Sequence, residues 1–251
     1  MNKTITITTD FGDQFAASQL RTVIAALDFD GHVVENHSVT PFSITEGAFQ
    51  MKQIARFSAN GSVHIGVVDP GVGSDRWGVV IETSRSFLVG PNNGLLYPLA
   101  SEEAIKNVWR IDEVTFGDDV TRTFHGRDVF VKAGVFLAQG QRPGDFGCET
   151  VNEGLLVHKE FIDGEIVHID AYGNYKIHWT KDLTIGSSLN VKTASGRQLT
   201  VPIVRTFNDV GANKPMALWG SHGTLELAIN LGNAKEHFGF ELGDRLYILN
   251  G

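Results

Sequence analysis

The hydrophobic pattern of the chain changes near residue 150, and this change constrains the fold more than any other feature. Before that point, runs of β-branched residues are followed by loops and then by segments with helical spacing. Residues 4–9 alternate threonine and isoleucine as a strand does, and residues 15–27 place their apolar side chains on one helical face. Strands that alternate with helices are typical of α/β domains with a mostly parallel sheet. We therefore expect such a domain over residues 1–150.

The other elements of this first domain follow the same alternation. The pattern predicts a short strand at 33–34, a helix at 44–57, a buried strand at 62–68, a strand pair at 78–82 and 86–89, and a helix at 129–138. A dense turn cluster at 90–94 follows the strand pair. Several of these strands end in glycine, proline, asparagine or aspartate.

Beyond residue 150, short strands are separated by glycine, asparagine and aspartate, and helical signals are few. The expected strands lie at 165–170, 175–180, 188–193, 198–203, 216–219, 225–229 and 245–249. This pattern predicts a small antiparallel, β-barrel-like domain over residues 160–251, with residues 151–159 as the linker.

Charge and composition exclude several classes of partner. The 251 residues carry a formal net charge of −8, and an acidic surface repels phosphate backbones and anionic lipid headgroups. We therefore expect a small-molecule substrate and neither nucleic acid nor a membrane as partner. The single cysteine, Cys148, cannot form a disulfide within the chain, and no signal-peptide pattern or long apolar run is present. These features predict a cytoplasmic protein.

Polar residues gather where the predicted strands of the first domain end. Asp10 follows the first strand, Asp69 follows the strand at 62–68, and His125 comes just before the last helix. In open α/β sheets, ligands bind beyond the carboxyl ends of the strands, so these positions predict a site. Taken separately, each also has an ordinary explanation, because aspartate is common in turns and histidine is often buried with a hydrogen bond.

Familiar catalytic and cofactor motifs are absent. The sequence has no Gly-x-Gly-x-x-Gly after a strand, no Walker A loop, no His-Glu-x-x-His and no Gly-x-Ser-x-Gly. One cysteine cannot supply a zinc cluster. The sequence therefore gives no motif support for a dinucleotide-binding protein, a P-loop phosphate site, a zinc protease or a serine hydrolase.

Seven stretches in order resemble one family, the S-adenosyl-L-methionine hydrolases, or hydroxide adenosyltransferases, which are related to the fluorinating and chlorinating enzymes that use the same substrate. The stretches are 8–12, 40–42 with 46–48, 67–73 with Arg76, 90–94, 123–128, 169–174, and 220–223 with 225–228. No single stretch is specific, but the set covers nearly the whole chain.

The resemblance implies a substrate site drawn from both domains. Asp10 matches a carboxylate that holds the ribose hydroxyls, and charge-assisted hydrogen bonds suit that task. Phe42 matches an aromatic residue that lines the ligand, and Ser221 matches a residue near the methionine carboxylate. Asp170, Tyr172 and Asn174 match a segment that contacts methionine and adenine. The other implied substrate-binding residues are Asn93, Phe124, Glu226 and Ala228.

The resemblance also implies a catalytic set of Asp69, Arg76 and His125 around an attacking water. Our hypothesis makes His125 the proton acceptor or hydroxide holder, while Asp69 orients or pairs with Arg76 and Arg76 stabilises negative charge on the oxygen; the sequence leaves open which of the three takes the proton. No metal and no cofactor beyond the substrate, S-adenosyl-L-methionine, are implied. Relatives form trimers in which each site lies between subunits, so we expect a homotrimer.

Three alternatives remain at this point. Halide transfer to C5′ needs donors and a dry pocket, and an anionic Asp69 near the halide would cost about 4 kcal/mol at 4 Å and an effective dielectric of 20. Gly126 leaves this choice open, because fluorinating relatives carry serine there while chlorinating ones can have glycine. A non-catalytic binder would keep Asp10, Asn174 and Ser221 but would not need the catalytic set. An unrelated metal-dependent hydrolase would be sensitive to chelators.

Overall fold

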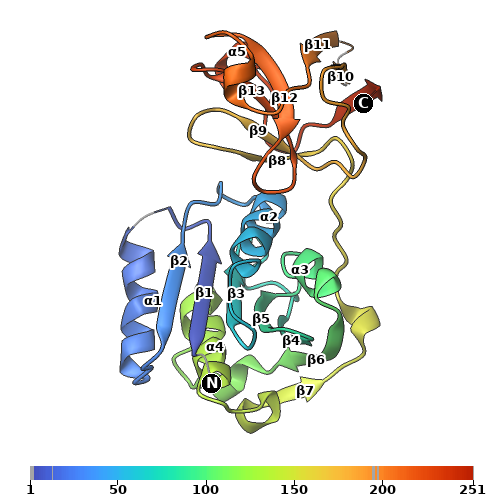
Figure 1. Cartoon of the computed structure of the whole chain (residues 1–251). Helices are drawn as coiled ribbons and strands as arrows, with labels where there is room; N and C mark the ends of the chain where they lie inside the picture. The colour runs from blue at the N-terminus through green and yellow to red at the C-terminus, as the bar shows by residue number, and fades with distance from the viewer. Residues whose placement is uncertain (1–2, 13, 194–195, 197, 251) are drawn as a thin grey trace. The chain divides into compact units, whose positions relative to one another are not determined.

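The computed structural model of the chain describes residues 3–12, 14–193, 196 and 198–250. The chain divides into two compact units, residues 1–160 and 161–251, and each is described by itself (Figure 1). Among the described residues, none of the helices has the length and apolar character that crossing a bilayer requires.

The N-terminal unit is built on a seven-stranded sheet. In spatial order its strands are β2 (His32–Asn36), β1 (Thr4–Thr9), β3 (Val63–Val67), β5 (Phe87–Pro91), β4 (Gly78–Thr83), β6 (Ile105–Ile111) and β7 (Cys148–Thr150). Strands β2, β1, β3 and β5 pair in parallel, and β4 pairs with β5 and β6 in antiparallel fashion. Strand β6 thus runs with the parallel set, and only β4 and β7 run against it. The sheet is mostly parallel, as the sequence predicts.

Helices cover both faces of this sheet (Figure 1). Helices α1 (Gln14–Ala26) and α4 (Val131–Ala138) pack on one face, and α2 (Ile44–Ala55) and α3 (Tyr97–Glu102) pack on the other. All five residues of β3 are buried, as expected for a central strand covered on both faces, and its one polar side chain, His64, has Thr6 as a hydrogen-bond partner. The main core joins α1 and α4 to the sheet through side chains such as Leu20, Ile65 and Phe130.

Short irregular helices complete the unit. Three are 3₁₀ helices, at Glu113–Phe116, Pro143–Phe146 and Glu153–Leu155, and one is a π-helical turn, Gly126–Phe130, that runs directly into α4. Residues 151–159, which the sequence predicts as a linker, pack on the N-terminal unit. Asn92 donates to the Leu155 carbonyl over 3.0 Å and accepts from the Val157 amide over 2.8 Å.

The C-terminal unit contains two antiparallel sheets. One has the order β11 (Gln198–Pro202), β10 (Ser188–Thr193), β14 (Leu246–Asn250), and the other has the order β12 (Pro215–Trp219), β13 (Leu225–Ile229), β9 (Tyr175–Ile177), β8 (Ile166–Ile169). The helices of this unit are α5 (Ala234–Phe238) and a 3₁₀ turn, Phe207–Asp209.

Isolated bridges join these two sheets at both edges. Ile203 pairs with Ala217, next to β11 and within β12, and Glu165 pairs with Arg245, next to β8 and β14. The seven strands therefore form a closed circuit around one apolar core, which includes Tyr175 and Leu227. The fold class predicted from the sequence, a mostly parallel α/β domain followed by a small antiparallel β-barrel-like domain, is confirmed.

Candidate active site

Two aspartates lie side by side at the carboxyl edge of the parallel sheet. Thr9 of β1 is in register with Val67 of β3, so Asp10 and Asp69 leave the sheet at the same edge. They border a cavity of about 110 Å³, here called the inner cavity. Its lining is Asp10, Phe11, Phe42, Val67, Asp69, Val72, Thr123, Phe124, His125 and Gly126. The expectation that polar residues at strand ends meet in space is therefore met for Asp10, Asp69 and His125.

Asp69 forms a side-on ion pair with Arg76. Arg76 Nε donates to Asp69 Oδ1 over 2.9 Å and to Oδ2 over 3.0 Å, and Arg76 Nη2 also donates to Oδ2. Their side chains are 7% and 10% exposed. Burying two charges is costly unless the geometry is good, and this two-nitrogen fork is the favourable geometry for arginine and carboxylate. The turn between them packs closely against the backbone at Arg122, since a Cβ at Gly73 would lie 2.7 Å from the Arg122 carbonyl oxygen.

His125 joins this pair through one ring atom. His125 Nδ1 lies 3.1 Å from Arg76 Nη2 and 3.1 Å from Glu113 Oε1, and Arg76 Nη1 is 3.5 Å from the same Glu113 oxygen. The His125 side chain is 6% exposed and packs its ring against Phe130. Asp69, Arg76, Glu113 and His125 thus form one polar group, here called the arginine cluster.

The segment that precedes α4 holds His125 in place. Asp128 accepts from the Thr121 amide over 2.9 Å and from Arg127 Nε over 2.6 Å. Burial raises the pKa of Asp128, but hydrogen bonds from Arg127 and Thr121 outweigh it and hold that pKa below its usual value. His125 stands at the start of the π-helical turn, and such wide turns are frequent at functional sites.

Asp10 and Phe42 form another part of the wall of the inner cavity. Asp10 Oδ2 accepts from the Phe42 amide over 2.8 Å, and in the described part of the chain Oδ1 has no polar partner. Phe42 has a φ of +66° and a side chain that is 72% exposed. A left-handed backbone at a non-glycine residue stores strain, and such strain is concentrated at ligand sites. This wall therefore offers one open carboxylate oxygen and one open aromatic face.

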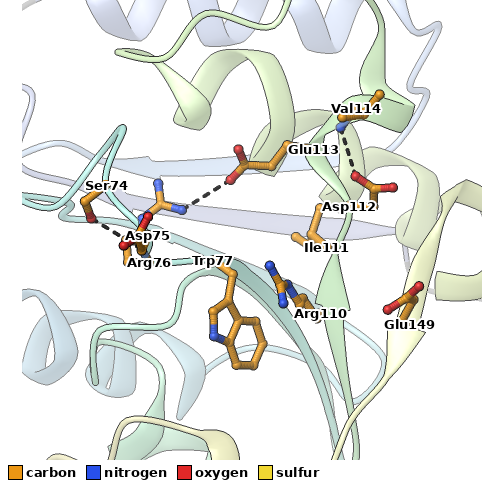
Figure 2. A pocket seen from close by; sticks show the side chains of 10 residues that line it. All are labelled: Ser74, Asp75, Arg76, Trp77, Arg110, Ile111, Asp112, Glu113, Val114 and Glu149. Carbon is orange, nitrogen blue, oxygen red and sulfur yellow. Dashed lines mark hydrogen bonds and ion pairs between the residues drawn. The ribbon is translucent and has the colours of Figure 1, made fainter.

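A larger cavity of about 500 Å³, here called the outer cavity, borders the same cluster (Figure 2). Arg76 and Glu113 line it together with Trp77, Arg110 and Glu149, whereas Asp69 and His125 line the inner cavity. The arginine cluster consequently separates the two cavities. Figure 2 shows the Glu113 carboxylate directed toward the Arg76 guanidinium, with Glu149 apart from both.

Comparison with known proteins gives this arrangement a family. A model of the S-adenosyl-L-methionine (SAM) hydroxide adenosyltransferase N-terminal domain matches residues 5–147, and a model of the C-terminal domain of the same family matches residues 164–247. The chain belongs to the SAM hydroxide adenosyltransferase family.

Two curated relatives are similar to this chain over nearly its full length, and a third over about three quarters of it. A protein of Salinispora tropica named (R)-S-adenosyl-L-methionine hydrolase is 34% identical over 98% of both chains. A protein of Methanocaldococcus jannaschii with the same name is 29% identical over 98% of this chain and 95% of that protein. A fluorinase of an Actinoplanes species is 24% identical over 78% of this chain and 79% of that protein. A crystal structure of an uncharacterized conserved protein from Thermotoga maritima shares the fold, with a TM-score of 0.89, 22% identity and coverage of 97% and 99%.

In the C-terminal unit, several expected substrate-binding residues are joined by hydrogen bonds and ion pairs. Asp170 Oδ2 accepts from Asn174 Nδ2 over 3.2 Å and from Lys176 Nζ over 3.0 Å, and Lys176 Nζ also lies 2.6 Å from Glu226 Oε1. Burial raises the pKa of Asp170, but the hydrogen bonds from Lys176 and Asn174 outweigh it and lower that pKa overall. Asp170, Asn174, Lys176 and Glu226 are here called the lysine cluster.

The other expected substrate residues differ in accessibility. Tyr172 is 77% exposed, Ser221 is exposed, and Ala228 is fully buried in β13. The Asn93 side chain donates to the Val68 carbonyl over 2.8 Å and accepts from the Leu95 amide over 3.1 Å, so it braces the end of β3. Ala228 is therefore part of the packing of its unit, and the Asn93 side chain is engaged with neighbouring backbone groups.

Two charged residues of these clusters were not expected from the sequence. Glu113 stands in no motif, and Lys176 lies in an ordinary strand. Lysine is almost never fully buried without a partner, so the burial of Lys176 in β9 marks it, and that burial is known only from the structure. Within residues 3–12, 14–193, 196 and 198–250, no group of three or more His, Cys, Asp or Glu residues is arranged to hold a metal ion.

Proposed function

We propose that this protein hydrolyses S-adenosyl-L-methionine to adenosine and L-methionine by attack of water or hydroxide at C5′. The observation that carries the proposal is that hydrogen bonds join Asp69, Arg76 and His125 at the wall of the inner cavity, which Asp10 also lines. The family and the names of its relatives support the same reaction.

The reaction is an in-line displacement at carbon. The water oxygen forms a bond to C5′, the C5′–S bond breaks, and its electron pair returns to sulfur to give a neutral thioether. Because the sulfonium is a good leaving group, no acid is needed there. The nucleophile is the difficult part, since bulk water has a pKa of about 15.7. His125 accepts the water proton, and one proton is released for each substrate consumed.

Asp69 and Arg76 hold the charge of the site in place. Both Asp69 oxygens accept from Arg76, so Asp69 orients the guanidinium. Arg76 in turn brings a fixed positive charge beside His125, where negative charge develops on the attacking oxygen. Such preorganised charges work well in a site with little water, where the effective dielectric is low.

Substrate binding uses groups from both units. Asp10 Oδ1 accepts from the ribose hydroxyls, and Phe42 and Phe124 supply apolar contact. Asp170, Tyr172, Asn174, Ser221 and Glu226 belong to the segments that recognise adenine and methionine. No metal and no further cofactor take part in this proposal.

The assembly is a homotrimer in which a second chain's C-terminal unit completes each site, and the protein acts in the cytoplasm. The exposed Phe42 and Tyr172 side chains are consistent with surfaces that a ligand and a neighbouring chain cover. Mixing an Asp69→Asn variant with a Tyr172→Ala variant tests the arrangement. If each site combines the N-terminal unit of one chain with the C-terminal unit of another, mixed trimers contain some intact sites and form adenosine. If each site lies within one chain, the mixture stays inactive.

The proposed substrate carries the (R) configuration at sulfur, and the name (R)-S-adenosyl-L-methionine hydrolase of two relatives supports this choice. Separate incubations with the (R) and (S) epimers test this point. Faster adenosine formation from the (R) epimer supports the proposal, and faster formation from the (S) epimer contradicts it.

The test of the reaction is incubation of the pure protein with S-adenosyl-L-methionine in halide-free buffer, with adenosine followed by liquid chromatography. Asp69→Asn should abolish the product. Glu102→Gln is the matched control, because it removes an exposed carboxylate of the same unit that pairs with Lys52 and lines neither cavity of the candidate site. Tight binding without adenosine would indicate a non-catalytic binder, and a 5′-chloro product that requires added chloride would indicate a halogenase.

A further inference from the structure

We propose that Glu113 is a positioning residue of this site, which holds His125 in the tautomer whose Nε2 accepts the proton of the attacking water. The inference rests on the proposed function, because that function makes His125 the proton acceptor. It adds Glu113 to the set of Asp69, Arg76 and His125, on the basis of the contacts within the arginine cluster.

His125 Nδ1 lies near two groups with opposite hydrogen-bonding roles, one a donor and the other an acceptor. Arg76 Nη2 is a hydrogen-bond donor 3.1 Å away, and Glu113 Oε1 is an acceptor at the same distance. A neutral imidazole nitrogen either carries a proton and donates, or lacks one and accepts. The two contacts therefore favour opposite tautomers of His125.

Each tautomer has a consequence at the other ring nitrogen. Among the described residues, Nε2 of His125 has no polar partner, and the ring lines the inner cavity. When Nδ1 carries the proton and donates to Glu113, Nε2 keeps a lone pair for the proton of water. When Nδ1 accepts from Arg76, Nε2 already carries a proton and cannot act as a base. Glu113 is the group that selects the productive tautomer against Arg76.

The same carboxylate stabilises the ring after proton transfer. The imidazolium carries protons on both nitrogens, so its Nδ1–H still donates to Glu113. When the Nε2 proton leaves to solvent after product release, the ring returns to the starting tautomer. No proton passes through Glu113, and its role is orientation and charge stabilisation.

The backbone around Glu113 is firmly held. Glu113 opens the 3₁₀ helix Glu113–Phe116, whose preceding residue Asp112 accepts from the Val114 amide over 3.2 Å. Thr115 Oγ1 donates to the Asp112 carbonyl over 2.7 Å and to the Phe146 carbonyl over 3.0 Å. This anchoring suits a residue that must keep one carboxylate oxygen against a buried ring.

Glu113 is also reachable from the outer cavity. Its side chain is 31% exposed, compared with 6% for His125 and 10% for Arg76. Removing the Glu113 side chain therefore leaves a space beside His125 Nδ1 that a small carboxylate can enter from solvent. Formate added to a Glu113→Ala variant is the probe for that space.

The experiment measures the tautomer and the kinetics in the full-length protein. Imidazole ¹⁵N shifts of His125, assigned by their loss in His125→Asn, report which nitrogen carries the proton in the free protein. Glu113→Ala is compared with Glu149→Ala, which removes a carboxylate that lines the same outer cavity but has no polar contact to His125 or Arg76 in the described part of the chain. We expect wild type and Glu149→Ala to protonate Nδ1, and Glu113→Ala to protonate Nε2.

The kinetic result should match the tautomer. We expect Glu113→Ala to lower kcat by about 100-fold while KM stays within about twofold of wild type. Added formate should raise the kcat of this variant by about tenfold. An unchanged tautomer in Glu113→Ala, or an equal loss of kcat in Glu149→Ala, would overturn the proposal. If wild type forms no adenosine, the proposed function fails, and the ¹⁵N shifts alone decide the role of Glu113.

Discussion

Each unit of the protein buries one cation between two carboxylates, but the two clusters are completed in different ways. In the arginine cluster, Arg76 contacts Asp69 and Glu113. In the lysine cluster, Lys176 contacts Asp170 and Glu226, and its side chain is only 4% exposed. Both arrangements cost desolvation, so each must be held by further hydrogen bonds.

The further hydrogen bonds show what each cluster does. Asp170 also accepts from the amides of Tyr172 and Asn174, over 3.0 Å and 2.9 Å, so the lysine cluster closes on the loop that carries the exposed Tyr172. The arginine cluster instead adds a histidine, one of whose ring nitrogens has no polar partner in the part of the chain that the structure describes, and it lies between two cavities. A cluster whose hydrogen bonds are all made within the fold holds the backbone in place. A cluster that keeps a free ring nitrogen at a cavity can also take part in a reaction.

The largest expected effect is on the arginine cluster. His125→Asn should lower adenosine turnover by about 1,000-fold, because it removes the proton acceptor, and the melting temperature should change little. Steady-state kinetics and a thermal melt of the same preparation measure both quantities. A variant that melts much lower yet turns over normally would mean that the arginine cluster is structural, like its counterpart.

The lysine cluster should show the reverse behaviour. Lys176→Met leaves Asp170 and Glu226 buried without a counter-charge, so the C-terminal unit should lose about 3 kcal/mol of stability. Hydrogen exchange measured by mass spectrometry resolves the two units in the intact protein. The double variant Lys176→Met with Glu226→Gln is the control, because it removes one of the stranded charges and should recover part of the loss. Equal exchange in wild type and Lys176→Met would show that this cluster contributes no stability.

Acid should destabilise the N-terminal unit at a higher pH than the C-terminal unit. Burial lowers the pKa of His64, in β3, from 6.5 to about 4. The unfolded chain therefore takes up this proton first, so the stability that neutral His64 supports is present above pH 6.5 and is lost as the pH falls toward 4. We expect the N-terminal unit to lose about 2 kcal/mol between pH 7 and 4.5.

The C-terminal unit should respond only at lower pH. The pKa of Asp170 is held below its usual value of 3.8, so its contribution to stability is lost below that pH. Hydrogen exchange at pH 7 and 4.5, corrected for intrinsic rates, compares the units directly. His64→Gln keeps a partner for Thr6 and should flatten the response of the N-terminal unit; a response that persists in this variant would assign the acid effect to other groups.

The part of this organisation that the sequence predicts is the part that depends on local pattern. Asp10 and Asp69 were expected together because they follow parallel strands, and the register of β1 with β3 places them so. Local pattern also predicts most of the strands in both units. Fold and strand ends are therefore accessible from periodicity and turn residues alone.

What the sequence did not predict depends on distant contacts or on short elements. Strands β6 and β7 and helices α3 and α5 were missed, because β6 alternates imperfectly, β7 has three residues, and the two helices have six and five. The π-helical turn Gly126–Phe130 has no periodic signature, so the expected helix began at residue 129. Glu113 lies 37 residues from Arg76 in the chain, and only the folded sheet brings them together.

The smallest expected effect concerns the open wall of the inner cavity and separates binding from chemistry. Asp10→Asn keeps the side-chain oxygen that the Phe42 amide needs but loses the charge that strengthens hydrogen bonds from the ribose hydroxyls. We expect affinity for S-adenosyl-L-methionine to fall by about tenfold, or roughly 1.4 kcal/mol, while kcat at saturation stays within about threefold. Calorimetric titration of the His125→Asn background, with and without Asp10→Asn, measures affinity without turnover. If Asp10→Asn lowered kcat as severely as His125→Asn and left affinity unchanged, Asp10 would belong with the reacting groups, and the division of the cavity into a binding wall and a chemical wall would be wrong.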